Sequence, residues 1–575
     1  MASGKRTEQR YCTYILRSMA SDYPVSDYTP SSFHPGDIPW SVRHRIASVL
    51  LLFSFATAIQ AARPTTVVDL GYAKYEGSLN NQTGNIEFLG IRYAASPTGS
   101  LRWRGPQTPH KIHGIQKADT FPTSCYQAGD GASPNTPFPL NRRQNQPAPT
   151  FSEDCLFLDV TTPASTTEDL PVIVWIHGGG YQAGSVSGFD GDDLVREAGG
   201  GVVAVLIQYR LGVLGFLSGQ QVRDGGALNA GLLDQQFALQ WVQRHISKFG
   251  GDPKKVTIWG ESAGAGSVLQ HVIANDGNTR PPLFRAAISS STFLPSQYAF
   301  NDPIPEQLFG EVVSQTGCSS SRHPLECLRQ VDAELLQQVN VNVSLSAFFG
   351  TWVFVPVVDG HFITKRPTQL LREGKVNGEA LLAVTNPLEG RIFVDLSTAP
   401  TVETPTYLAN LFPKFRNVDI ATGAAQYKDQ GTPIDQAIAI MGESIFICPT
   451  YFFLRAFKNK SFKGQFAIPP GDHGMDVIFY FPNGTPGQDP PFNNTLFINN
   501  FGQSFLNFAL SLDPNVKWDP ANTVPHWAKW NDRSRTEMLF NKTSEDEPVF
   551  KPISTDAKLL ERCEFWESVA ALTAQ

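Results

Sequence analysis

Charge of either sign is scarce in this chain, and so is any pattern that would hold a metal ion. Only 17% of the 575 residues are charged, and the formal net charge is -7 at pH 7. Without an excess of basic residues, we expect no face that binds nucleic acid or an anionic lipid surface. The sequence has no internal repeat, no long low-complexity segment and no clustered metal-ligand motif. Its hydrophobic content of 41% is instead typical of an ordinary globular core.

The N-terminal residues predict a targeting segment rather than a part of the folded domain. Arg43 and Arg45 precede an apolar run, residues 46–59, and small residues follow it. This order is typical of a secretory signal, and the run is short for a membrane span. Its distance from the first methionine is unusual, so either the true start lies downstream of residues 1–45, or residues 46–62 are a signal-anchor that tethers the protein to a membrane. We favour secretion without a stable membrane partner, with residues 63–575 as one domain.

Asn-x-Ser/Thr sequons agree with secretion. All six follow the signal and none precedes it, although each sequon alone is weak evidence because the pattern arises by chance. The candidate glycosylation sites are Asn81, Asn342, Asn459, Asn483, Asn493 and Asn541.

Apolar runs alternate with helical patterns along most of the chain. Short alternating segments between residues 66 and 91 predict antiparallel strands at one edge of a sheet. Continuous apolar runs at residues 172–176, 202–207, 256–259, 286–289 and 380–384 predict strands buried on both faces. The strand–helix alternation predicts an α/β fold with a large, mostly parallel sheet and helices on both faces. Residues 303–370 and 404–575 are expected to form a cap of helices and loops.

The segment around Ser262 predicts a nucleophile elbow. An apolar β-branched run ends in Gly260-Glu-Ser-Ala-Gly264, and small residues follow at once. In such a strand–turn–helix the neighbours of the serine need almost no side chain, and the helix N-terminus points at the reaction centre. A Gly-x-Ser-x-Gly pattern alone is often an ordinary loop, so partners are required.

The order of residues along the chain selects those partners. In the α/β-hydrolase order an acid and then a histidine follow the serine. His473 and His526 lie late enough; His526 is flanked by bulky residues and is interpreted as structural, whereas His473 lies in a loop of small residues. Glu389 follows the apolar run 380–384 and is the candidate acid, the alternative being a solvated loop glutamate. Backbone N–H groups of Gly179 and Gly180, with that of Ala263, are candidate oxyanion donors.

Together these segments resemble the type-B carboxylesterase family, which includes cholinesterases and large fungal lipases. The resemblance covers nearly the whole chain after the signal, and the chain is similar to secreted fungal members of the family. It implies an α/β-hydrolase fold with Ser262 as nucleophile, Glu389 as acid, His473 as base, and Gly179, Gly180 and Ala263 as oxyanion donors. The matching motifs are Gly90-Ile-Arg-Tyr, Glu153-Asp-Cys-Leu, His177-Gly-Gly-Gly, Tyr209-Arg-Leu-Gly, Phe249-Gly-Gly-Asp-Pro, Gly260-Glu-Ser-Ala-Gly and Asp513-Pro-Asn.

The resemblance also implies three disulfides and reveals four departures. The implied pairs are Cys125–Cys155, Cys318–Cys327 and Cys448–Cys563, which suit an oxidising compartment. Arg92 stands where the family often has proline, and Asp159 and Gln208 stand where it often has asparagine. Residues 289–292 lack a usual glycine near the acyl pocket, which could alter the acyl groups that fit.

The implied reaction is hydrolysis of a small-molecule ester through an acyl-enzyme, with no metal or other cofactor. The segment between Cys125 and Cys155 is polar and proline-rich. It therefore favours a soluble carboxylesterase for small to medium esters over a lipase or sterol esterase with an apolar lid for long-chain esters. A catalytically inactive, cholinesterase-like binding protein is a second alternative, which the intact set of site residues disfavours. The sequence does not indicate the oligomeric state.

Overall fold

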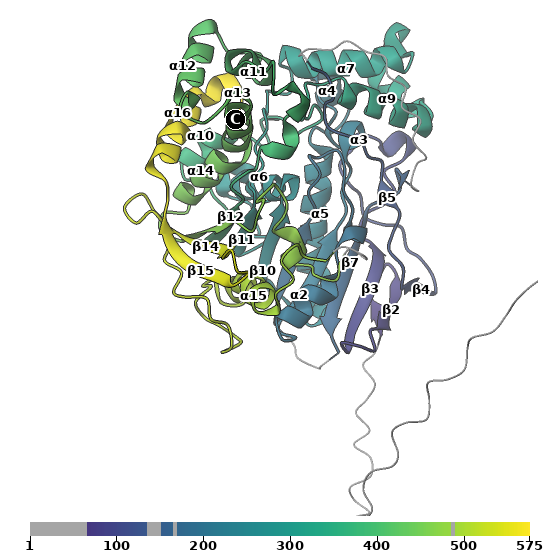
Figure 1. Ribbon diagram of the computed structural model, residues 1–575. Helices are drawn as coiled ribbons and strands as arrows, with labels where there is room; N and C mark the ends of the chain where they lie inside the picture. The colour runs from purple at the N-terminus through teal and green to yellow at the C-terminus, as the bar shows by residue number, and fades with distance from the viewer. Residues whose placement is uncertain (1–65, 135–150, 165–168, 485–488) are drawn as a thin grey trace, which may run out of the picture. The chain divides into compact units, whose positions relative to one another are not determined.

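A large mixed sheet runs through the part of the chain that the structure describes (Figure 1). The structure is a computed structural model and describes residues 66–134, 151–164, 169–484 and 489–575. The predictions for residues 1–62 and much of the segment between Cys125 and Cys155 lie outside these ranges. Residues 64–575 form one compact unit.

The sheet confirms the predicted mostly parallel architecture with an antiparallel N-terminal edge. Seven adjacent strands in the middle of the sheet pair in parallel. The strands of the N-terminal edge and the last strand pair antiparallel with their neighbours along the sheet. In spatial order the described strands are β1 (Val67–Asp69), β2 (Lys74–Leu79), β3 (Asn85–Arg92), β7 (Phe157–Pro163), β9 (Val203–Ile207), β8 (Leu170–Ile176), β10 (Gly251–Glu261), β11 (Ala286–Ser290), β12 (Ala380–Thr385), β13 (Ser461–Phe466), β14 (Thr536–Lys542) and β15 (Pro548–Ser554), with β4 (Ile115–Ala118) beside β2. Outside this sheet, β5 (Ser124–Cys125) pairs with β6 (Phe151–Ser152).

The side chains of the central strands contribute to two hydrophobic cores, one on each face of the sheet. On β8, Val172, Val174 and Ile176 belong to one core, and the alternate residues Ile173 and Trp175 belong to the other. Successive side chains of a strand point to opposite faces, so a continuous apolar run fits a strand that helices cover on both sides.

Helices cover both faces. On one face, α5 (Ala230–His245) and α6 (Ala263–Gly277) contact β10. On the other, α2 (Gly191–Glu197) contacts β7 and β9, and α15 (Thr495–Ser511) contacts β8. Helix α15 carries phenylalanines every three or four residues, and its Phe505 ring stacks on Trp259 of β10 with centroids 5.4 Å apart. Periodicity of this kind places one helix face on the sheet.

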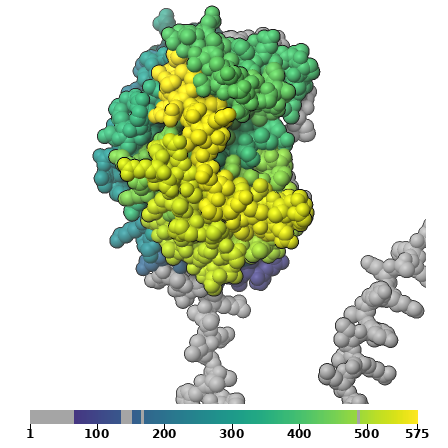
Figure 2. Space-filling view, turned by 60° about the vertical axis from the view of Figure 1, so that its left-hand side comes forward, coloured from purple at the N-terminus to yellow at the C-terminus, as the bar shows by residue number. Residues whose placement is uncertain are grey.

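Further helices gather at the top of the view in Figure 1. In Figure 2 the yellow C-terminal segment lies on the surface beside green helices, and α16 indeed contacts α12 and α14. The remaining described α-helices are α3 (Gly212–Phe216), α4 (Gln220–Gly225), α7 (Pro303–Gln315), α8 (Pro324–Gln330), α9 (Ala333–Leu345), α10 (Pro367–Arg372), α11 (Thr404–Leu411), α12 (Asn417–Tyr427), α13 (Pro433–Gly442), α14 (Cys448–Ala456) and α16 (Ala557–Thr573).

The sequence interpretation of residues 404–575 was incomplete. Strands β13, β14 and β15 fall in this region and extend the sheet beyond β12. Strand β13 (Ser-Phe-Lys-Gly-Gln-Phe) has no continuous apolar run because its buried positions include Ser461 and Lys463. The Lys463 ammonium is buried against Glu537 of β14, 3.2 Å away. Because an ion pair lies where a buried strand usually has apolar residues, the sequence of β13 shows no hydrophobic run.

One helical stretch is apolar enough to be mistaken for a membrane span. Residues Pro433–Ala456 form 24 consecutive helical residues that include a π-helical turn, η7 (Glu443–Ile447). In this protein 89% of its most apolar window is buried inside the fold. The stretch is therefore accounted for as a core helix.

All three expected disulfides are present: Cys125–Cys155, Cys318–Cys327 and Cys448–Cys563. The third joins residues 115 positions apart and fastens α16 to α14. Closing so long a loop stabilises the fold mainly by restricting the unfolded chain.

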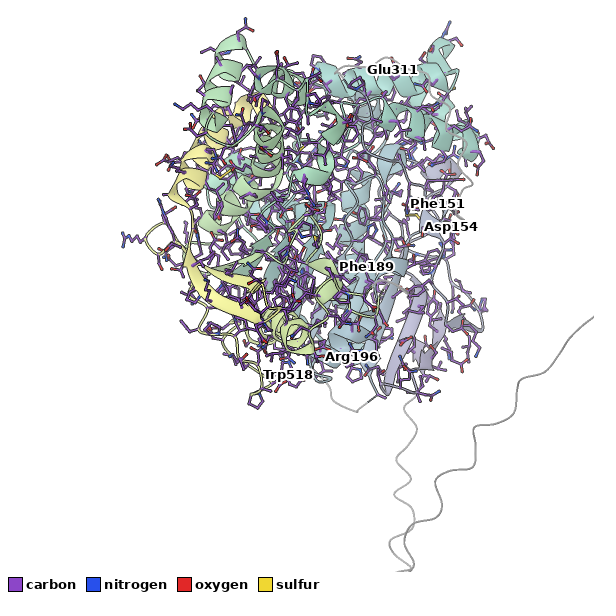
Figure 3. The ribbon with its side chains drawn as sticks, in the orientation of Figure 1. Phe151, Asp154, Phe189, Arg196, Glu311 and Trp518 are labelled. Atoms are coloured by element: carbon purple, nitrogen blue, oxygen red, sulfur yellow. A yellow bond between two sulfur atoms is a disulfide. The ribbon has the colours of Figure 1, made fainter. Side chains whose placement is uncertain are left out.

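Two of the departures from the family pattern have local partners. The Arg92 guanidinium donates to both carboxylate oxygens of Asp154, at 2.6 and 2.8 Å, and lies 4.3 Å from the centre of the Phe157 ring. Asp154 is at the right of Figure 3. The Gln208 amide donates to the carbonyl oxygens of Thr123 and Cys155, beside the first disulfide. Arg92 and Gln208 thus both form polar contacts close to the first disulfide, at Asp154 and at Cys155.

The third departure, Asp159 on β7, is a buried carboxyl group with an incomplete set of partners. Its Oδ1 accepts a hydrogen bond from the Gly90 N–H at 2.6 Å, whereas its Oδ2 is buried with no partner among the described residues. Burial raises the pKa of Asp159 to about 7 from 3.8. For a carboxyl group whose pKa rises on folding, the stabilising contribution is complete below the unfolded value and is lost as the pH rises through the folded value.

We therefore predict that Asp159→Asn makes the protein more stable above pH 8 and removes part of its pH dependence. The ionised carboxylate costs the folded state about 2 to 4 kcal/mol there, and the neutral amide avoids this cost while keeping an oxygen for Gly90. Thermal unfolding at pH 5.5 and 8.5 measures the effect. An equal fall in Tm between these pH values for both proteins would contradict the prediction.

Candidate active site

Ser262 lies at a sharp turn between β10 and α6. Its backbone has φ 55° and ψ −123°, a strained conformation for a residue with a side chain, and helix α6 begins at the next residue, Ala263. The Ser262 N–H donates to the Ser290 carbonyl at the end of β11, at 3.0 Å. Strain of this kind persists only where the surroundings enforce it, and it is typical of functional turns.

The glycines around Ser262 are required by contact. A Cβ atom on Gly260 would overlap the backbone of Gly264, and one on Gly264 would overlap the Ile176 carbonyl at the end of β8. A Cβ on Gly178 would lie 3.0 Å from the Ser262 Cβ. The glycine loop after β8 therefore lies directly against the serine.

That loop adopts backbone conformations that favour glycine. Gly179 and Gly180 have φ 100° and 63°, values that residues with side chains rarely adopt. The neighbouring His177 stacks on Tyr209 with ring centroids 4.5 Å apart, and burial lowers its pKa to about 4. His177 is therefore neutral and adds no charge to the site.

Glu389 and His473 meet across two neighbouring strands. Glu389 follows β12, His473 follows β13, and the His473 Nδ1 lies 2.5 Å from the Glu389 Oε2. The other oxygen, Oε1, accepts from the Asn386 N–H and from the Ser291 hydroxyl, both at 2.7 Å. Glu389 is fully buried, which excludes the alternative of a solvated loop glutamate.

The second imidazole nitrogen faces another carboxyl group. His473 Nε2 lies 3.2 Å from Oε1 of Glu261, the residue before Ser262, and neither atom has a hydrogen-bond partner among the described residues. Burial raises the pKa of Glu261 to about 8, with smaller contributions from Asp476 and Glu389. Although burial alone lowers it, Glu261 and Glu389 raise the pKa of His473. Glu261 thus acts on the imidazole through its charge, at 3.2 Å, and not through a hydrogen bond.

A further buried carboxyl group, Asp476, is linked to Glu389 through Asn386. It accepts from the Asn386 amide at 3.2 Å and from the Tyr480 hydroxyl at 2.9 Å. Burial raises the pKa of Asp476. Asn386 thus holds Glu389 through its backbone and Asp476 through its side chain.

Aromatic rings wall the site. His473 contacts Phe446 and Phe393, with centroids 4.4 and 5.1 Å away. Trp352 packs edge-on against Phe393 and Phe293, at 4.9 and 4.7 Å, and its indole occupies the place that a Gly180 Cβ would need. Trp352 also lines a cavity of about 170 Å³ whose other lining side chains are largely apolar, among them Leu308, Val355 and Met441.

Sequence reasoning located the three candidate residues Ser262, Glu389 and His473 but missed their partners. Glu261 and Asp476 lie one and three residues from Ser262 and His473, so proximity in sequence was an available signal. Ser291 belongs to the segment that departs from the family pattern, and here its hydroxyl binds Glu389. Nothing in the sequence marked Trp352. Among the residues that the structure describes, no group of three or more His, Cys, Asp or Glu could hold a metal ion.

The architecture defines an α/β-hydrolase: a mostly parallel sheet, helices on both faces, and a serine at the turn from a central strand into a helix. Residues 64–566 match the carboxylesterase family, and the chain belongs to that family. It is a carboxylic ester hydrolase.

Individual relatives agree with this membership. The chain is 30% identical to a carboxylesterase, patB, of Aspergillus clavatus over 91% of its own length and 99% of that protein's. It is 33% identical to secreted lipase 1 of Botryotinia fuckeliana over 84% and 89% of the two chains. The crystal structure of Aspergillus niger EstA superimposes with a TM-score of 0.78 at 29% identity, covering 89% of this chain and 99% of that one.

The Glu261–His473 contact predicts a shift in the pH dependence of activity. In Glu261→Gln the imidazole loses a carboxyl neighbour that raises its pKa, so the acid limb of the kcat/KM profile moves to lower pH. We expect kcat/KM at the optimum to fall by no more than about tenfold, because the imidazole remains.

A matched control is Glu311→Gln on helix α7, at the top of Figure 3, which should leave the profile unchanged. An acid limb that stays in place in Glu261→Gln would show that Glu261 does not raise the pKa of His473.

Proposed function

We propose that the protein hydrolyses esters through an acyl-enzyme on Ser262. His473 takes the proton of the serine hydroxyl, the oxygen attacks the ester carbonyl, and the alcohol leaves with that proton. Water then repeats the sequence on the acyl-enzyme and releases the acid. The observation that carries the proposal is the 2.5 Å contact between His473 and the buried Glu389, with the imidazole 3.2 Å from Glu261, the residue before the strained Ser262 turn.

Each remaining part of the site has a role in this reaction. Glu389 fixes the imidazole and stabilises its charged form, because Asn386 and Ser291 orient its carboxylate. The backbone N–H groups of Gly179, Gly180 and Ala263 stabilise the oxyanion, often the largest single contribution to catalysis. His473 Nε2, which has no hydrogen-bond partner among the described residues, accepts the serine proton in the first step. No metal or other cofactor takes part.

The substrate that fits best is a small to medium ester. Trp352 lies against Gly180, and the rings of Phe293, Phe393 and Phe446 surround it, so the space next to the oxyanion loop is short. This supports a carboxylesterase, the activity named for the patB relative.

The alternative is a lipase or sterol esterase for long-chain esters. The apolar cavity that Trp352 lines favours it, because a shift of the indole would join that cavity to the site and admit a longer chain. The name of the Botryotinia relative, secreted lipase 1, agrees with this alternative.

A p-nitrophenyl ester series from acetate to palmitate tests both readings. We expect a maximum at short to medium chains and a loss of at least about 10³-fold in Ser262→Ala, since the nucleophile is removed. A maximum at long chains that rises at an oil–water interface would favour the lipase. Full activity in Ser262→Ala would overturn the mechanism.

We further propose that the protein is secreted, with residues 63–575 as one glycosylated domain. Three disulfides and the secreted Botryotinia relative support this location over a membrane tether. The six sequons differ in their surroundings. Asn81, Asn459 and Asn493 are exposed outside helices and strands, whereas Asn342 and Asn541 are half-buried in α9 and β14. The backbone and side-chain N–H groups of Asn483 donate to the buried Asp193.

We predict glycans on Asn81, Asn459 and Asn493 and none on Asn483, whose amide is engaged with Asp193. Peptide mass spectrometry of the secreted protein before and after endoglycosidase treatment identifies the occupied sites. Asn459→Gln should lower the mass by one glycan, and Asn483→Gln is the matched control that should not. A glycan on Asn483 would contradict this assignment.

A further inference from the structure

An ion pair joins the two loops that carry Glu389 and His473 without including either residue. The first loop follows β12 and the second follows β13, its parallel neighbour. The Arg391 guanidinium, two residues after Glu389, donates to the carboxylate of Asp472, the residue before His473. Arg391 and Asp472, each close in sequence to a residue of the candidate triad, therefore form an ion pair with each other.

The backbones of the loops meet at the same place. Leu388 pairs with Asp472 as an isolated parallel bridge, and the Leu388 N–H donates to the Gly471 carbonyl at 2.9 Å. Gly471 has φ 77°, and a Cβ on it would lie 2.6 Å from the Pro387 side chain. Only glycine allows this approach.

These contacts form a closed ring. Glu389, Gly390 and Arg391 are consecutive, Arg391 binds Asp472, His473 follows Asp472, and its imidazole returns to Glu389 at 2.5 Å. Neither loop is part of the sheet, so the strand ladder does not fix the angle between carboxylate and imidazole. A short ring that includes an ion pair restricts that angle, and errors of about 1 Å in such geometry can cost about 10²-fold in rate.

The exposure of the pair separates this role from general stability. The Arg391 and Asp472 side chains are 36% and 14% exposed. Because the guanidinium is partly exposed to solvent, the pair contributes less to folding than a fully buried pair would. Their loss should therefore be visible in catalysis before it is visible in Tm.

We propose that Arg391 and Asp472 are positioning residues that hold the Glu389 and His473 loops in register for catalysis. The proposal rests on the proposed triad. It assigns neither residue a contact with the substrate, so their loss should reduce kcat and leave KM nearly unchanged.

A double-mutant cycle with Arg391→Gln and Asp472→Asn tests the proposal. We expect kcat for p-nitrophenyl butyrate to fall about tenfold in each single variant, KM to stay within about twofold, and the double variant to be no worse than the poorer single, because both remove one contact. Arg391→Lys should recover part of the loss, since it keeps the charge. Additive losses in the double variant would overturn the pair as a unit.

The matched control is Arg455→Gln. Its partner Asp532 is also distant in sequence, and Nε lies 3.0 Å from Oδ1, but the pair joins α14 to the segment before β14. Its kcat should equal that of the wild type. A tenfold loss there as well would show that any such pair has this effect and would overturn the assignment.

The pH profile distinguishes positioning from simple electrostatics. The groups facing His473 are Glu389 on Nδ1, Glu261 on Nε2, and Asp476 nearby. If the pair positions the loops, either substitution loosens the Glu389 contact that raises the His473 pKa, and the acid limb moves to lower pH in both. If the pair acts only through its charges, Arg391→Gln moves the limb to higher pH and Asp472→Asn to lower pH, and positioning is overturned.

Ser262→Ala, measured beside these variants, separates the two levels of inference. Activity that survives in Ser262→Ala overturns the triad. Activity lost there but unchanged in Arg391→Gln and Asp472→Asn overturns only the positioning role.

Discussion

The close approach of β8, β10 and α6 is the constraint on which the site depends. Gly264, in the first turn of α6, lies against the carbonyl at the end of β8, and Gly260 lies against Gly264. No side chain fits between these backbones, so the chain must turn sharply and leave Ser262 at φ 55°. The same contact brings the glycine loop after β8 against the serine. One steric requirement thus places both the candidate nucleophile and the candidate oxyanion donors.

Buried charge is the second organising feature. Glu261, Glu389 and Asp476 surround a single imidazole, and Lys463 lies buried in the strand that leads to it. Buried carboxyl groups are costly unless hydrogen bonds or protons compensate them. Asn386, Ser291 and Tyr480 supply hydrogen bonds, and burial raises the pKa of Glu261, which favours its neutral form. The positions of these groups are therefore mutually dependent.

The aromatic rings beside this polar centre are supported by the C-terminal helix. Phe446, whose ring contacts His473, lies in a π-helical turn, a feature frequent at functional sites. The turn begins at Glu443, which Arg562 of α16 binds through two hydrogen bonds, and Cys448 just beyond it is bonded to Cys563. The C-terminal helix therefore fixes the element that supports one side of the site.

The sequence by itself determined the fold class and the order of Ser262, Glu389 and His473, because strand patterns, glycine turns and chain order are local or one-dimensional properties. The three disulfide pairs followed only from the family resemblance. Only the tertiary structure decided that β13 to β15 extend the sheet, since Lys463 and Glu537 conceal a buried strand within a polar pattern. It alone placed Trp352 on Gly180, Glu261 on the imidazole, and Arg391 on Asp472. These contacts join residues from separate loops, and the direction of each side chain depends on packing across strands that are distant in the sequence.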